Sequence, residues 1–253
     1  MCSISGIIGH ISEKNIQDAS KSRKIIKYRG PDDDGIYLDK GAVLTHNRLS
    51  IIDINPRSSQ PMQCNEGRFI ITFNGEIYNY IELREELKKA YNFTTSSDTE
   101  VLLAAYLAWK EKALDKVVGM FAFCIYDSLT KEAFLARDEF GQKPLYYSLV
   151  NENLVFASEV KSLLCYSIQP KTNLNVWGRY LIKASYDDSS RTYFENINQL
   201  LVEIEDTFKD EVDLEVILVD DGSPVSLEDV IKKSEYKFNI QIVTNRYNLG
   251  QSK

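Results

Sequence analysis

The chain has 253 residues, of which 43% are hydrophobic and 26% charged, which are the proportions of an ordinary soluble globular protein. Its formal net charge of −7 argues against nucleic acid or an anionic membrane as the main partner, because both select basic surfaces. No apolar run approaches the roughly 18–20 residues that span a bilayer, and the N-terminus lacks the basic region and cleavage site of a signal peptide. We therefore expect a cytoplasmic protein.

The four cysteines do not form a recognisable framework. They are widely scattered, no Cys-x-x-Cys pair occurs, and only two histidines are present in the chain. Neither a disulfide network nor a metal site is expected from this pattern. The cysteines are Cys2, Cys64, Cys124 and Cys165.

In chain order, strand patterns come first, helix patterns second, and strand patterns again third. After an opening apolar strand, a helix is expected over 16–27 and ends in turn chemistry at 28–35. The further expected elements are β-rich runs at 42–54 and 68–73, helices at 78–90 and from 97 onward, and β-rich segments at 119–126, 133–136, 145–149 and 154–157. This order favours layers of antiparallel sheet covered by helices.

The pattern changes after about residue 165. Residues 166–191 show no clear period and are predicted to be a linker or a partial domain. From Glu195, five apolar residues fall on one helical face, which predicts a helix reaching Phe208. A continuous apolar strand at 216–219, a capped helix at 226–233 and a strand at 240–244 complete the tail, a succession typical of a parallel sheet.

Cys2 directly follows the initiator methionine, and removal of Met1 would leave it with a free α-amino group beside its own thiol. An α-amine titrates near ~7.7–8.0 and a thiol near ~8.5, so the amine can take a proton as the sulfur attacks. A small second residue is common in chains where it has no chemical role. The functional interpretation therefore depends on the rest of the chain.

Several motifs follow Cys2 in a fixed order, and together they resemble the glutaminase domain of the class II glutamine amidotransferases, which are N-terminal nucleophile hydrolases. The motifs are 1–6 (MCSISG), 29–32 (RGPD), 46–53 (HNRLSIID), 73–79 (FNGEIYN) and 97–100 (SDTE). Three more, at 119–123, 137–147 and 156–161, narrow the resemblance to the asparagine synthetase branch. The resemblance covers a domain of residues 2–165 and implies an α+β fold, the four-layer αββα sandwich of this superfamily.

The resemblance implies that Cys2 attacks the side-chain amide of glutamine, forming a thioester that water hydrolyses to glutamate, with ammonia released. Asn74 and Gly75 would stabilise the oxyanion of the tetrahedral intermediate, and each such donor is typically worth ~10²–10³ in rate. On local sequence alone, Asn74-Gly75 is more typical of a hairpin turn than of an oxyanion site.

The substrate carries a carboxylate and an ammonium group, so its pocket needs one fixed charge of each sign. Arg48 offers a bidentate fork for the carboxylate and Asp98 a counter-ion for the ammonium. Glu76 and the backbone around Ile51 and Ile52 would complete the binding site. Taken singly, Arg48 is also compatible with a solvated strand residue, and Asp98 with an ordinary acid in the first turn of a helix.

Asparagine synthetases also carry an ATP-dependent domain marked by a Ser-Gly-Gly-x-Asp-Ser loop, which the printed sequence lacks. The glutaminase step itself is expected to need no cofactor, since ATP and magnesium belong to that missing synthetase domain. We accordingly expect no asparagine formation by this chain, and consider a separate ammonia-accepting synthetase as a possible partner.

Residues 195–253, after a linker at 166–194, are similar to the start of a GT-A type glycosyltransferase, with Asp220-Asp221-Gly222-Ser223 at the end of a strand. The first strand and the metal-binding Asp-x-Asp of that family are missing, which suggests an incomplete α/β fragment from a fused or truncated reading frame. Two other functions stay open: a glutamine-binding relic without turnover, and an accessory domain fused to a sugar transferase.

Overall fold

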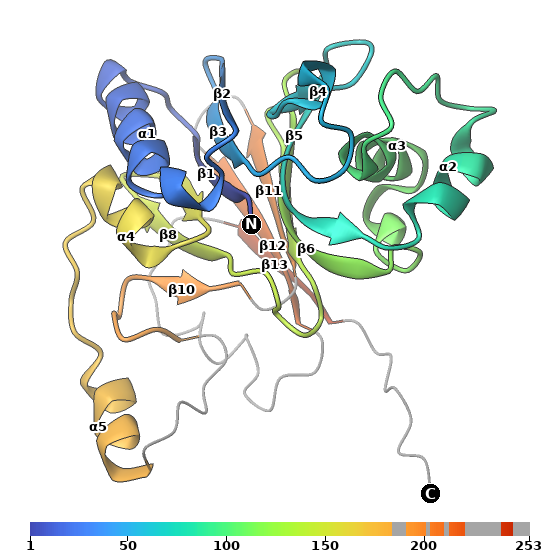
Figure 1. Ribbon diagram of the computed structural model, residues 1–253. Coiled ribbons are helices and arrows are strands. Elements are labelled where there is room, and N and C mark those ends of the chain that lie inside the picture. Colours follow the sequence, from blue (N-terminus) through green and yellow to red (C-terminus); the bar gives the residue numbers. More distant parts are fainter. Residues whose placement is uncertain (184–190, 201–202, 210–212, 221–238, 245–253) are drawn as a thin grey trace, which may run out of the picture.

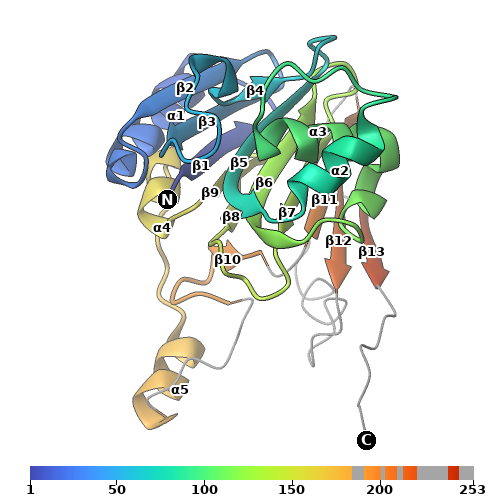
Figure 2. The same ribbon diagram turned by 45° about the vertical axis from the view of Figure 1, so that its right-hand side comes forward.

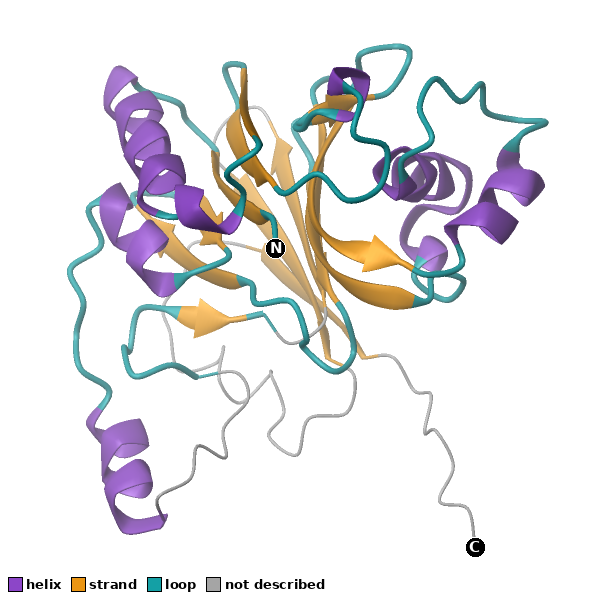
Figure 3. Cartoon of the chain, viewed as in Figure 1, coloured by secondary structure: helices purple, strands orange, loops and turns teal. Residues whose placement is uncertain are grey.

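The computed structural model describes residues 1–183, 191–200, 203–209, 213–220 and 239–244. Two β-sheets lie face to face, with helices on both outer sides (Figures 1 and 3). The N-terminus lies near the gap between the two sheets (Figure 1). Within the described ranges, no helix is long and apolar enough to cross a membrane.

The first sheet has the strand order β10-β8-β9-β1-β3-β2, and all its pairs are antiparallel. Its central strand β1 pairs with β3 on one side and with β9 on the other. The strands are β1 (Ser3–Ile8), β2 (Asp33–Leu38), β3 (Ala42–Arg48), β8 (Tyr146–Val150), β9 (Asn153–Ala157) and β10 (Asn198–Gln199).

The second sheet has the order β13-β12-β11-β7-β6-β5-β4 and is antiparallel except between β12 and β13. Its longest ladder joins β5 and β6 over nine residue pairs, so β5 is held firmly along its whole length. The strands are β4 (Met62–Gln63), β5 (Phe69–Ile77), β6 (Gly119–Asp127), β7 (Ala133–Arg137), β11 (Glu203–Lys209), β12 (Asp213–Asp220) and β13 (Asn239–Thr244).

Helices α1 and α4 cover the outer face of the first sheet, and α2 and α3 cover the outer face of the second (Figure 1). Helix α5 lies apart from this layered unit in both views (Figures 1 and 2). The α-helices are α1 (Glu13–Ile25), α2 (Tyr80–Leu87), α3 (Asp98–Trp109), α4 (Val160–Leu163) and α5 (Leu174–Lys183). Short 3₁₀ turns occur at Lys27–Arg29, Pro56–Ser58, Lys110–Ala113 and Leu164–Tyr166.

Three apolar cores separate the four layers. Successive side chains of a strand point to opposite faces, so Ile4 and Ile8 of β1 lie between the sheets while Ile7 packs under α1 with Ala19. The inner strands β6 and β9 are buried along nearly their whole length, which is why they show apolar runs instead of alternation. The predicted α+β class, with antiparallel sheets covered by helices, is confirmed.

The chain after residue 165 differs from the prediction in two described places: helix α5 lies within the expected linker, and the first element of the tail is not a helix. The helix expected from Glu195 to Phe208 is wrong: the chain there forms β10 and β11, and β11 pairs antiparallel with β7. The open edge of β7 offers unpaired backbone groups to a strand, and this long-range pairing overrides the local helical spacing. The expected strands at 216–219 and 240–244 are confirmed as the parallel pair β12 and β13. The expected helix at 226–233 lies outside the described residues.

Candidate active site

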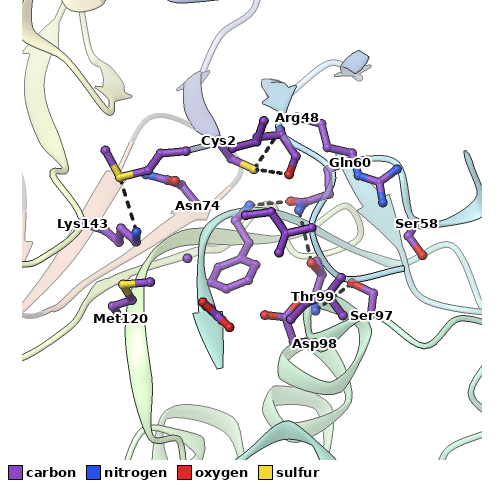
Figure 4. A pocket seen from close by; sticks show the side chains of 17 residues that line it. Cys2, Arg48, Ser58, Gln60, Asn74, Ser97, Asp98, Thr99, Met120 and Lys143 are labelled. Atoms are coloured by element: carbon purple, nitrogen blue, oxygen red, sulfur yellow. Dashed lines mark hydrogen bonds between the residues drawn. The ribbon is translucent and has the colours of Figure 1, made fainter. Parts of the chain in front are cut away.

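All eight residues singled out from the sequence line one pocket, a cavity of about 130 Å³, the scale of a small metabolite (Figure 4). They come from both sheets and from one helix: Cys2 immediately precedes β1, Arg48 ends β3, and Asp98 begins α3. The remaining residues are Asn74, Gly75 and Glu76 of β5 and Ile51 and Ile52 of the loop after β3.

The Cys2 thiol lies over the start of the loop that follows β3. Its Sγ accepts a hydrogen bond from the Leu49 N–H at 3.3 Å and lies 3.6 Å from the Leu49 carbonyl oxygen, to which it can donate. Burial raises the pKa of the Cys2 thiol, and the Leu49 N–H and the nearby positive charges only partly oppose this rise. The resting sulfur is therefore held as a thiol, and a base is needed to activate it.

Arg29 holds the backbone of Cys2. Its Nε donates to the Cys2 carbonyl oxygen at 3.2 Å, and its Nη1 pairs with Glu159 at 3.0 Å. Tyr28 and Lys161 also contact the Glu159 carboxylate, so the guanidinium rests on a fixed acid. The sequence motif at 29–32 served to indicate the family, but its role in positioning Cys2 emerges only from the fold.

Arg48 is 6% exposed and its guanidinium is held by carbonyl oxygens of the loop after β3, those of Asn55 at 3.2 Å and of Asp53. Among the described residues Arg48 forms no ion pair with a carboxylate. Asp53 in turn accepts from the Ser96 N–H at 2.7 Å, which ties the loop to the segment before α3. A buried guanidinium whose charge is not neutralised by a carboxylate is suited to binding an anionic ligand.

Asn74 and Gly75 lie inside β5, opposite Ala122 and Phe121 of β6, so the hairpin-turn interpretation is wrong. The Asn74 side chain is buried, and its Nδ2 has no hydrogen-bond partner in the part of the chain that the structure describes. A buried unpaired donor of this kind costs about 1–3 kcal/mol, which a ligand oxygen would recover.

Gly75 has no room for a side chain. An added Cβ would lie 2.3 Å from the Met120 carbonyl oxygen and 2.5 Å from the Phe73 ring. Glycine therefore allows the backbone of β5 to pass close to β6 beside the pocket.

Two buried side chains fix the residue before Asn74. Gln60 accepts from the Phe73 N–H at 2.7 Å and donates to the Thr99 hydroxyl at 3.2 Å (Figure 4). His46 of β3 donates from Nε2 to the Phe73 carbonyl oxygen at 3.0 Å and so joins the two sheets. Burial lowers the pKa of His46 to about 4, so the ring is neutral near pH 7. Sequence reasoning assigned neither residue a role, since both act on a segment distant in the chain.

Asp98 is 5% exposed, and one of its carboxylate oxygens accepts from the Ile77 N–H at 3.1 Å. Burial raises the pKa of Asp98 to about 6, against the effect of its backbone donors. Ser97 caps α3 by accepting from the Thr99 N–H at 3.1 Å. In the described part of the chain no cation pairs with Asp98, so a cationic ligand group would stabilise its charged form.

The pocket also contains residues that the sequence reasoning missed. Lys143 approaches from the loop after β7, and Met120 of β6, Ser58 and Thr99 complete the walls (Figure 4). The position of Lys143 in the motif at 137–147 was the only available signal.

A model of the glutamine amidotransferase domain matches residues 1–218. The chain belongs to this family. The amidotransferase domain is similar to asparagine synthetase [glutamine-hydrolyzing] 1 of Bacillus subtilis, with 46% identity over 167 residues, which are 63% of this chain and 26% of the relative. Asparagine synthetase B of Escherichia coli is 39% identical over 168 residues, covering 65% of this chain and 30% of the relative. The chain thus matches less than a third of these two relatives.

Solved structures agree on the fold of this amidotransferase domain. The glutamine phosphoribosylpyrophosphate amidotransferase of B. subtilis superposes with a TM-score of 0.54 at 21% identity, covering 66% of this chain and 44% of that one. The matched model extends to residue 218, beyond the domain end expected at 165.

Proposed function

We propose that the chain hydrolyses L-glutamine to L-glutamate and ammonia through a thioester on Cys2, as the glutaminase part of a glutamine-hydrolysing asparagine synthetase. The observation that carries the proposal is the unpaired, buried Nδ2 of Asn74 in the same pocket as the Cys2 thiol. A nucleophile and an unused hydrogen-bond donor facing one cavity are what acyl transfer through a tetrahedral intermediate requires.

The charges of the pocket fit glutamine. The buried Arg48 guanidinium would bind its α-carboxylate, and the Asp98 carboxylate would bind its α-ammonium. Glu76 and the backbone at Ile51 and Ile52 are proposed to complete this clamp. The clamp leaves the side-chain amide as the group that reaches the thiol.

The proposed reaction begins with removal of Met1, which frees the α-amine of Cys2. This amine takes the thiol proton as sulfur attacks the amide carbon, and the resulting oxyanion is bound by the Asn74 amide and the Gly75 N–H. The carbon–nitrogen bond then breaks, the nitrogen takes the proton from the amine, and ammonia leaves. Water adds to the thioester, the carbon–sulfur bond breaks, and glutamate is released with the thiol restored.

The test is glutamate and ammonia release from glutamine by the purified protein, with intact mass spectrometry of its N-terminus. Cys2→Ala should abolish turnover while glutamine binding, measured by calorimetry, is largely kept. Cys165→Ala removes another partly buried thiol outside the pocket and should retain wild-type activity. Full activity of Cys2→Ala, or of molecules that keep Met1, would contradict the mechanism.

We further propose that glutaminase turnover by this polypeptide needs no cofactor and that its ammonia serves a separate synthetase or escapes to solvent. Adding ATP, magnesium and aspartate should then produce no asparagine and should not change the rate of glutamate release. Asparagine formation would show that the chain has a synthetase function of its own.

For residues 195–253 we propose an α/β segment that does not transfer sugars. The parallel pair β12 and β13, with Asp220 ending β12, supports the resemblance to the GT-A family, whereas the antiparallel pairing of β11 with β7 and β12 does not. Calorimetry of the full chain with UDP-glucose and Mn²⁺ should detect no binding, and saturable binding would overturn this part.

A further inference from the structure

Lys143 is a buried lysine at the pocket, and both of its backbone polar groups are hydrogen-bonded. Its side chain is 5% exposed and its residue lines the cavity. Its backbone N–H donates to the Asp138 carboxylate at 2.9 Å, and its carbonyl oxygen accepts from Arg137 Nε at 2.7 Å. The backbone of Lys143 is therefore fixed at both groups, and the residue is buried against the pocket.

The ammonium group of Lys143 is directed at the N-terminus. Its Nζ lies 3.5 Å from the Met1 sulfur, a weak acceptor that cannot neutralise a charge (Figure 4). Among the described residues Lys143 forms no ion pair. Burying an ammonium group without a carboxylate is costly, and the fold keeps this one beside the proposed nucleophile.

Charged and titratable groups surround this ammonium from several elements. Asp138, from the end of β7, already accepts from the backbone N–H groups of Phe121 and Gln142. The other groups whose charges act on Lys143 or on the Cys2 thiol are Arg29, Arg48, Glu76 and Asp98. Burial has the largest effect, and it lowers the pKa of Lys143 below that of a free lysine.

Removal of Met1 would create an α-amine on Cys2, the residue next to the one whose sulfur Lys143 contacts, and the Cys2 thiol already acts electrostatically on Lys143. An α-amine has an ordinary pKa of ~7.7–8.0, so at pH 7 only roughly a tenth to a sixth of it could accept a proton. Lysine is the more basic of the two amines, with an ordinary pKa of ~10.4, so it keeps its proton while the α-amine gives its own up first.

We propose that the Lys143 ammonium holds the α-amine of Cys2 in its neutral, proton-accepting form near pH 7. Lys143 acts through this amine and is not itself a reacting group. The inference rests on the proposed function, because it needs Cys2 as the N-terminal nucleophile. It adds a residue from the loop after β7 to the machinery that activates the thiol.

The test compares pH profiles of kcat/KM for glutamine in three variants. Lys143→Met removes the charge at similar length, Lys143→Arg keeps it, and Lys112→Met removes one exposed lysine outside the pocket as a control for net charge. We expect the acidic limb of Lys143→Met to move up by roughly one pH unit, since a nearby like charge shifts a pKa by about this amount or more. That shift lowers kcat/KM about tenfold at pH 6.5 and little at pH 9. Lys143→Arg and Lys112→Met should keep the wild-type limb.

A direct titration makes the test independent of variant folding. With ¹⁵N-labelled cysteine, the pKa of the Cys2 α-amine in the wild-type protein should lie below ~7.7, the lower end of the range for a free terminus. A value at or above that range, or an unchanged acidic limb in folded Lys143→Met, overturns the role of Lys143. Absence of any glutaminase activity in the wild type would instead contradict the proposed function, so the two failures are distinguishable.

Discussion

At the scale of single residues, the pocket combines groups whose interactions are incomplete. Within the described ranges, Asn74 has a buried amide nitrogen without an acceptor, Arg48 a guanidinium without a carboxylate, and Asp98 a carboxylate without a cation. Each costs folding free energy in the free protein, and each is complementary to one group of glutamine or of its tetrahedral intermediate.

Asn74→Ala should lower kcat more than it changes KM. The amide nitrogen gains its full value only when the oxyanion forms, and loss of one such donor typically costs ~10²–10³ in rate. Steady-state glutaminase assays give both constants. A large rise in KM with unchanged kcat would place Asn74 in ground-state binding instead.

Asp98→Asn should weaken glutamine binding and remove the pH dependence of the binding affinity. In the free protein the pKa of Asp98 is raised to about 6, and an ammonium ligand favours the charged form, so wild-type affinity should fall as the pH drops below about 6. Calorimetric titrations with Cys2→Ala as background, from pH 5 to 8, measure this dependence without turnover. Equal slopes with and without the Asn substitution would exclude Asp98 as the counter-ion.

At the scale of elements, β5 is the strand that organises the site. It carries three proposed site residues in succession, its ladder with β6 runs through all of them, and Gln60 and His46 hold both backbone groups of Phe73. Such restraint keeps the Asn74 donor in place before the substrate arrives, which is what electrostatic preorganisation requires.

Gly75→Ala should disrupt this strand. The new methyl would lie 2.3 Å from the Met120 carbonyl oxygen, so β5 and β6 would have to move apart, with loss of activity and destabilisation by roughly 1–3 kcal/mol or more. Gly178→Ala in α5 is the matched control, because no described atom outside its own helix backbone lies within 4 Å of the added carbon and alanine favours a helix. Thermal unfolding and activity measure the contrast. Comparable behaviour of the two variants would contradict the close approach.

At the scale of the whole molecule, the site lies where the two sheets meet α3. Two buried titratable groups there make the free energy of unfolding depend on pH. Burial raises the pKa of Asp98 to about 6, so its contribution to stability falls as the pH rises from about 4 to 6. Burial lowers the pKa of His46 to about 4, so its contribution is full above about 6.5 and is lost as the pH falls through 4. The two slopes oppose each other between pH 4 and 6.

Single substitutions should therefore separate the two slopes. Relative to wild type, Asp98→Asn should gain about 3 kcal/mol of stability between pH 4 and 7, and His46→Gln should lose about as much, since one pKa unit corresponds to about 1.4 kcal/mol. Urea unfolding at each pH measures both, and the difference from wild type cancels the other carboxylates. Parallel curves for wild type and variants would show that neither group titrates with the shifted pKa.

The sequence by itself predicted the fold class and eight residues of the pocket, through motifs that resemble the class II glutamine amidotransferases. Cys2, Arg48, Asn74 and Asp98 belong to the ordered motifs that carry this resemblance, which implied their roles and therefore that they meet in one cavity. The helix expected from residue 97 onward is likewise present as α3, and its start depends on a local contact, the cap between Ser97 and the Thr99 N–H.

The tertiary structure alone decided which residues support those side chains and how the tail folds. Gln60, His46 and Lys143 act on backbone or charge that is distant in the chain, and only sheet packing brings them to Phe73 and Met1. The segment expected to be a helix ending at Phe208 became a strand because the edge of β7 offers hydrogen bonds that a local apolar period cannot reveal. Helix caps and sequence motifs depend on neighbouring residues, whereas strand pairing and the burial of charges depend on contacts that form only when distant segments meet.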